Sequence, residues 1–158
     1  MPDAEENGLE NGLDSEFASA EDSTGLMLWR VTNAWQAAQR AALRPFDLTH
    51  VQFVLLASLA WLDTDGPTTQ RELSRHAGTD PMMTSQVLRT LERKDLVERS
   101  GHPTDARAKS LRVTAAGAEL ARHATTAVEG VDQRFFTPLG AERAVFTGML
   151  RVVLGPAS

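Results

Sequence analysis

Four polar side chains share one predicted helix face and suit hydrogen bonding to DNA: Ser85, Gln86, Arg89 and Arg93. Thr84, next to them in the chain, is a fifth candidate for a contact in the major groove. Gln can pair bidentately with adenine and Arg with guanine, while Ser and Thr can bond to bases or phosphates. The apolar residues between them predict an opposite face that packs against the protein: Met83, Val87, Leu88 and Leu91. A solvated surface helix would show the same two faces, so the neighbouring elements must decide between the two interpretations.

A polar, basic stretch at 100–109 follows this predicted helix. Short β-compatible segments at 96–99 and 110–113 flank it, so the pattern predicts a hairpin with a long basic loop. On the other side of the helix, Thr69 and Glu72 form a capping box that begins a shorter helix. Gly78 ends that helix, and Asp80 followed by Pro81 marks the next helix start.

This order of a short helix, a turn, a longer helix and a hairpin predicts a winged helix-turn-helix. Apolar periodicity predicts further helices from Leu28 to about Pro45, over about 49–62, from Thr114 to about 136, and over about 140–154. We therefore expect a mainly α fold with a small β-hairpin wing and additional helices at both ends of the chain.

Four segments resemble the MarR family of transcriptional regulators: TQREL at 69–73, LERKDLVER at 91–99, TDARAK at 104–109 and LRVTAAG at 111–117. The resemblance implies that Arg107 enters the minor groove, where narrow A·T tracts concentrate negative potential. It also implies that Asp105 holds this arginine by a charge-assisted hydrogen bond and that Lys109 belongs to the same wing contact. Asp95 stands where relatives commonly carry Gly, and we expect a less favourable turn there within the same fold.

The charge distribution supports binding to nucleic acid although the net charge is −5. Residues 1–24 contain eight acidic side chains and no Lys or Arg, which leaves +3 for residues 25–158. Residues 89–112 contain seven Lys or Arg against four Asp or Glu, as a phosphate-contacting surface requires. The acidic, polar segment 1–22 is predicted to be disordered. It is either a solubilising tail or a segment that competes with DNA for the basic face.

The last predicted helix is apolar on more than one face, through Val145, Phe146, Met149, Leu150, Val153 and Leu154. A single helix at the end of a small domain cannot bury all of them, so we expect a homodimer; packing on the first helix is the alternative. The resemblance implies a dimerisation region of 23–46 and 114–155 around a DNA-binding domain of 47–113. It also implies a small-molecule effector site, for which the candidates are Trp29, Trp35, Arg40, Arg44 and Trp61.

No group of residues is spaced for catalysis. The four histidines are scattered, and no glycine-rich phosphate loop is present, so we expect neither an enzyme nor a cofactor. No apolar run reaches the length of a membrane span, and the chain has no export signal and no cysteine, which fits a cytoplasmic protein. The sequence predicts a regulator that binds a pseudopalindromic double-stranded operator. We favour a repressor; an activator is the alternative, since the choice depends on where the operator lies relative to the promoter. The alternative is a winged-helix module that binds protein instead of DNA.

Overall fold

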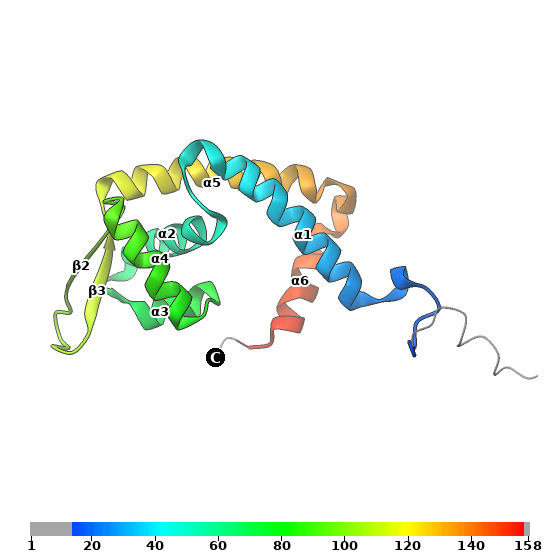
Figure 1. Cartoon of the computed structure of the whole chain (residues 1–158), viewed down its shortest axis with the longest axis horizontal. Helices are drawn as coiled ribbons and strands as arrows, with labels where there is room; N and C mark the ends of the chain where they lie inside the picture. Colours follow the sequence, from blue (N-terminus) through cyan, green and yellow to red (C-terminus); the bar gives the residue numbers. More distant parts are fainter. Residues whose placement is uncertain (1–13, 157–158) are drawn as a thin grey trace, which may run out of the picture. The chain divides into compact units, whose positions relative to one another are not determined.

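The computed structural model describes residues 14–156 of the 158-residue chain. By its contacts the chain divides into two units, residues 1–37 and residues 38–158. The described helices are α1 Thr24–Leu43, α2 His50–Leu62, α3 Gln70–Ala77, α4 Pro81–Arg93, α5 Ala115–Phe135 and α6 Arg143–Leu154 (Figure 1). The strands are β1 Thr68–Thr69, β2 Val97–Gly101 and β3 Lys109–Val113. The mainly α fold with a small β wing is confirmed.

The predicted hairpin is part of a three-stranded sheet. The strand order is β1-β3-β2, and β3 pairs antiparallel with both neighbours, with Thr68 opposite Leu111 and Val97 opposite Val113. The sequence analysis missed β1, because a strand of two residues is too short to show a period. Thr69 also caps α3, where its hydroxyl accepts the backbone N–H of Glu72, and that cap was the signal that the sequence carried.

The acidic N-terminal segment is described only in part. Residues 1–13 lie outside the described residues, so the prediction of disorder stays a prediction for them. Within residues 14–22, Ala20–Asp22 form one turn of 3-10 helix. The hydroxyl of Ser19 donates to Oδ2 of Asp22 at 2.9 Å and fixes the start of this turn.

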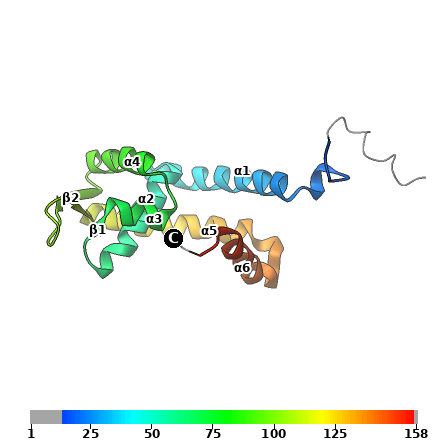
Figure 2. The same cartoon turned by 90° about the horizontal axis from the view of Figure 1, so that it is seen from below.

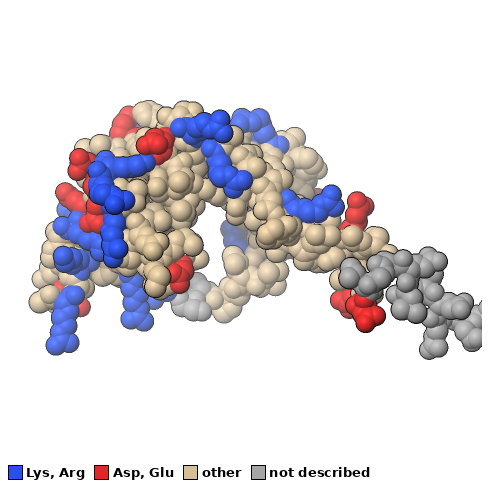
Figure 3. Space-filling model, in the orientation of Figure 1, with Lys and Arg blue, Asp and Glu red and all other residues tan. Residues whose placement is uncertain are grey.

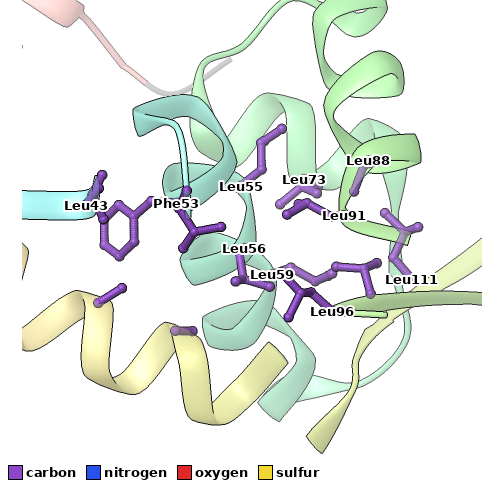
Figure 4. Packing of buried hydrophobic residues seen from close by; sticks show 14 of the residues in the cluster. Leu43, Phe53, Leu55, Leu56, Leu59, Leu73, Leu88, Leu91, Leu96 and Leu111 are labelled. Atoms are coloured by element: carbon purple, nitrogen blue, oxygen red, sulfur yellow. The ribbon is translucent and has the colours of Figure 1, made fainter. Parts of the chain in front are cut away.

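The core of the larger unit is built around α2. Leu55, Leu56 and Leu59 of this helix are fully buried, and they meet Leu73 of α3, Leu88 and Leu91 of α4, and Leu111 of β3 (Figure 4). The prediction that Leu88 and Leu91 face the protein is therefore confirmed. Met83 was placed on the same packing face, and this was wrong, since its side chain is 45% exposed. The next residue in the same turn, Thr84, is fully buried, so Met83, about 100° around the helix from it, lies beside the buried face.

The end of α4, the start of β2 and the start of α5 meet at one place, which we call the α4–α5 junction: Asp95, Leu96, Thr114 and Gly117. Asp95 has φ 55°, the left-handed conformation that the sequence analysis expected of an Asp in a glycine position. The Thr114 hydroxyl donates to the carbonyl of Asp95 at 2.6 Å, and the Thr114 N–H donates to the carbonyl of Leu96 at 3.1 Å. Both ends of the wing, after α4 and before α5, are therefore joined by the two hydrogen bonds of Thr114.

Gly117 allows α5 to approach this junction closely. A Cβ atom at position 117 would lie 2.0 Å from the carbonyl oxygen of Leu96 and 2.9 Å from Cγ1 of Val113. Because the nearer atom belongs to the backbone, a larger residue could fit only if α5 moved away from β2. The wing hairpin extends from this junction beyond the helices of the unit, as two perpendicular views show (Figures 1 and 2).

We predict that Gly117→Ala lowers the free energy of unfolding by about 2 kcal/mol or more, because the new methyl group collides with backbone. Gly130→Ala, in the same helix, is the matched control. A Cβ there would meet only Nη1 of Arg134, at an ordinary 3.5 Å, so the better helix propensity of Ala should raise stability by about 0.5–1 kcal/mol. Urea unfolding at one protein concentration measures both, and equal effects of the two changes would contradict the close approach.

Candidate nucleic-acid interface

The outer face of α4 presents three of the five predicted major-groove residues to solvent. Gln86, Arg89 and Arg93 are exposed, and Ser85 is half-buried. Arg93 donates from Nη2 to the Thr90 hydroxyl at 2.9 Å, so its guanidinium is held along the helix. No carboxylate of the described residues pairs with Arg89. Its charge is therefore available to a partner that approaches this face.

Thr84 does not belong to this face, and its prediction as a DNA contact was wrong. Its side chain is fully buried. The hydroxyl lies 2.7 Å from that of Thr79 and donates to the carbonyl of Asp80 at 2.8 Å. Thr84 therefore fastens the first turn of α4 to the turn before it. The usable signal was its spacing: Thr84 lies four residues before Leu88 and seven before Leu91, which places it on the apolar face of the helix.

The wing loop holds Asp105, Arg107 and Lys109, all of them exposed. Asp105 supports Arg107 differently from what the resemblance implied. Its Oδ1 accepts the backbone N–H of Arg107 at 2.9 Å, and within the described part of the chain no ion pair joins it to the guanidinium. Asp105 thus shapes the loop that carries Arg107 and leaves the positive side chain free to reach outward.

His102 acts as a second brace of the same loop, and the sequence analysis assigned it no role. Its Nδ1 accepts the backbone N–H groups of Thr104 at 3.3 Å and of Asp105 at 3.2 Å. The backbone N–H of His102 donates to the backbone carbonyl of Ala108 at 3.2 Å, and this hydrogen bond closes the loop. The only available signal was a His in a polar turn, where an acceptor for neighbouring N–H groups is useful.

Arg99 fixes the wing to the helices beneath it. Its Nε lies 2.9 Å from Oε1 of Glu92 on α4, and its Nη1 donates to Oε1 of Gln70 on α3 at 3.3 Å. Both charged side chains are largely shielded from solvent, which reduces screening of their attraction. The wing loop and the outer face of α4 are therefore held at a fixed spacing by one residue of β2.

Basic side chains gather over α3, α4 and the wing (Figure 3). Two of them that the sequence analysis did not single out are Arg71 and Arg75, both exposed on α3. They line a surface hollow with Gly78, Thr79 and Pro81, the residues that lead into α4. Their separation by four residues on one short helix was a usable signal, because it places both on one face.

The predicted effector residues do not share one hollow. Arg40 and Arg44 line a hollow with Asp47, Thr49 and Lys94. Trp61, 75% exposed, lines a different hollow between α2 and α5, together with alanines and threonines of these segments. Trp29 is exposed and Trp35 is half-buried, and both belong to the unit of residues 1–37. A single site formed by Trp61 and the two arginines together is therefore not supported by the larger unit.

Arg40 also acts on a half-buried histidine at the start of α2. Burial lowers the pKa of His50, the positive charge of Arg40 lowers it further, and the carboxylate of Asp132 opposes both. Asp132 also accepts a 2.7 Å hydrogen bond from Nε2 of the fully buried Gln39. These polar groups link the end of α1 to α2 and α5. The lowered pKa means that the neutral form of His50 is favoured in this environment.

The apolar residues of α6 are mostly exposed in the single chain. Val153 and Leu154 are 81% and 82% exposed, and no residue of this helix is fully buried. Phe146 differs from the other five predicted interface residues, because its ring packs 6.1 Å from that of Phe136 and is half-buried. Val145, Met149 and Leu150 are exposed as well, so an apolar surface on this helix is available to a partner.

Comparison with known proteins gives consistent matches. A family model described as the MarR family matches residues 48–109. The chain is 41% identical over 136 residues to the HTH-type transcriptional regulator YdcH of Bacillus subtilis, covering 85% of this chain and 92% of that protein. It is 34% identical over 117 residues to an HTH-type transcriptional repressor of Mycobacterium bovis, covering 74% and 82% of the two chains.

Solved structures agree with these relatives. MepR of S. aureus, solved in complex with DNA, superposes with a TM-score of 0.73 at 26% identity, covering 81% of this chain and 96% of MepR. CouR of Rhodococcus jostii, solved with p-coumaroyl-CoA, superposes with a TM-score of 0.75 at 27% identity, covering 85% and 92%. Both are similar to this chain over most of their length. Among the described residues, no single helix is long and apolar enough to cross a membrane.

We predict that His102→Ala loosens the wing loop and that His102→Asn does not, since the Asn carbonyl can accept the same two N–H groups as Nδ1. Amide hydrogen exchange followed by NMR is the measurement. The amides of Thr104 and Asp105 should exchange several-fold faster in the Ala variant and close to the wild-type rate in the Asn variant. Equal acceleration in both variants would show that the ring supports the loop in some other way.

We also predict a pH dependence of stability through His50. Because its pKa is lowered in the folded state, the unfolded chain takes up this proton first as the pH falls below about 6.5. The free energy of unfolding should therefore decrease between pH 7.5 and 5.5, and it should decrease less in His50→Gln, which cannot titrate. Chemical unfolding at the two pH values measures this, and an identical decrease in both proteins would exclude His50 as a source.

Proposed function

This chain belongs to the MarR family of transcriptional regulators, and from that premise we propose that it represses transcription by binding a pseudopalindromic DNA operator as a homodimer. The observation that carries the proposal is a pair of basic side chains that one compact unit presents to solvent. Arg89 lies on the exposed face of α4, and Arg107 lies in a braced wing loop. Neither has a carboxylate partner among the described residues, so both are available to bases or phosphates.

In this proposal α4 enters the major groove, because only that groove admits a helix and presents a distinct pattern for each base pair. Gln86, Arg89 and Arg93 face the bases, with Ser85 at the margin. The wing places Arg107 toward the neighbouring minor groove, with Lys109 near the phosphates. Arg71 and Arg75 of α3 add positive charge beside the head of α4. The DNA complex of MepR supports this function for a chain of the same fold.

The proposed dimer uses the exposed apolar side chains of α6. Val145, Met149, Leu150, Val153 and Leu154 would leave water on association, and this favours assembly. Two-fold symmetry then places the two α4 helices in successive major grooves, about 34–36 Å apart. In this proposed dimer, residues 23–46 and 114–155 form the dimerisation region, and residues 47–113 form the DNA-binding domain.

We further propose that a small molecule controls this repressor, as the p-coumaroyl-CoA complex of CouR supports. Such a ligand acts only through different affinities for two arrangements of the dimer, one of which has the spacing that DNA requires. Arg40 and Arg44 share a hollow with Lys94 at the end of α4, so an acidic ligand there would bear on the recognition helix. Because the proposed partner is DNA, we place this chain in the cytoplasm.

The test is selection of duplexes from a random pool by the purified full-length chain, followed by binding measurements at several salt concentrations. We predict an enriched pseudopalindrome with half-sites about one helical turn apart. Arg89→Ala should cost about 1–3 kcal/mol at one base position, and Arg107→Ala should relax the preference at A·T positions beside the half-sites.

Arg134→Ala is the matched control, since it removes the same charge from an exposed position on α5. It should leave the selected sequence unchanged. If no sequence is enriched and binding occurs only at low salt, regulation of an operator is excluded, and the alternative of a protein-binding winged helix becomes the better account. If Arg134→Ala remains dimeric in analytical ultracentrifugation and still weakens binding as much as Arg89→Ala, the placement of α4 in the groove is wrong.

A further inference from the structure

An exposed methionine stands at the head of the recognition face. Met82 is 72% exposed and follows Pro81 in the first turn of α4. Gln86, Arg89 and Arg93 follow it at spacings of four, three and four residues, which places all of them on one face of the helix. The opposite face is buried through Leu88 and Leu91. Met82 is therefore the apolar first member of a stripe that is otherwise polar.

The backbone at this end of α4 offers nothing to a phosphate group. Oδ1 of Asp80 accepts the N–H groups of Met82 at 2.9 Å and of Met83 at 3.0 Å, and Pro81 has no N–H. The N–H of Thr84 already donates to the carbonyl of Asp80. The exposed carboxylate of Asp80 would in addition repel a phosphate. The usual anion-binding property of a helix N-terminus is thus cancelled here by the cap.

From these observations we propose that Met82 contacts the 5-methyl group of a thymine in each half of the operator. This inference rests on the function proposed above. The N-terminal residues of a recognition helix contact base edges, and the thymine methyl is the apolar group that the major groove presents. A thioether side chain is flexible and polarisable, so it can cover a methyl group without a fixed hydrogen-bond geometry. Met82 is then a specificity-determining residue that selects thymine at its position.

Met83 is the natural comparison. It has the same chemistry, but it is rotated by about 100° around the helix from Met82 and is more buried, at 45% exposed. It lies toward the flank of α4 and outside the stripe of Gln86, Arg89 and Arg93. The structure therefore assigns thymine recognition to one of two adjacent methionines, which makes the proposal specific.

The experiment replaces each thymine of the selected operator, one at a time, with deoxyuridine, which lacks only the 5-methyl group. Dissociation constants are measured for the wild-type chain, Met82→Ala, Met83→Ala and Met82→Leu. For the wild type, one thymine in each half-site should bind about fourfold more tightly than deoxyuridine, the effect of burying one methyl group. Met82→Ala should bind both duplexes equally, whereas Met83→Ala and Met82→Leu should keep the preference for thymine.

Each result decides the matter. If Met82→Ala still prefers thymine at every position, or if Met83→Ala loses the preference instead, the proposal is overturned while the regulator function stands. If the pool yields no operator, the proposed function fails and this inference fails with it. Thermal unfolding of the variants excludes a folding defect, since the Met82 side chain is mostly in solvent and its removal should leave the midpoint unchanged.

Discussion

The α4–α5 junction is the constraint on which the rest of the larger unit depends. Thr114 bonds to the carbonyls of Asp95 and Leu96, and α5 approaches these atoms so closely that residue 117 must lack a side chain. This contact decides where the recognition helix ends, where the wing begins and where the long helix α5 starts. A regulator needs these three parts in a fixed relation. Hydrogen bonds to base edges form only over a narrow range of donor–acceptor distances, so a small shift of α4 would break them.

Rigidity continues from the junction to both proposed contact surfaces. The leucines that bury α4 also fix the direction of Gln86 and Arg89, since a helix cannot turn one face without turning the other. Arg99 ties β2 to the helices, through its ion pair with Glu92 of α4 and its hydrogen bond to Gln70 of α3. At the wing tip, His102 and Asp105 use backbone N–H groups to shape a loop that no core supports. Polar bracing thus replaces apolar packing where the chain extends into solvent.

The acidic and basic side chains near the proposed interface are arranged differently from one another. The chain is acidic overall, yet three described carboxylates near the interface are engaged within the fold: Asp80 caps α4, Asp105 shapes the wing and Glu92 holds Arg99. Arg89 and Arg107, by comparison, have no carboxylate partner among the described residues. This arrangement keeps a positive surface on an acidic protein, because these three carboxylates are engaged by backbone N–H groups or by Arg99 and do not pair with Arg89 or Arg107, although Asp80 and Asp105 are themselves exposed. The exposed apolar residues of α6 complete the set of surfaces that one chain leaves uncovered.

The sequence by itself determined the order of helices, their caps, the wing and the family, because these follow from local periodicity and from short motifs. Even the left-handed turn at Asp95 could be expected from the motif around it. Only the tertiary structure decided that Met82 and Met83 are exposed, that β1 joins the sheet and that the effector candidates lie in separate hollows. The physical reason is that such features depend on neighbours far away in the chain: Thr68 of β1, for example, finds its partner Leu111 only when β3 folds beside it.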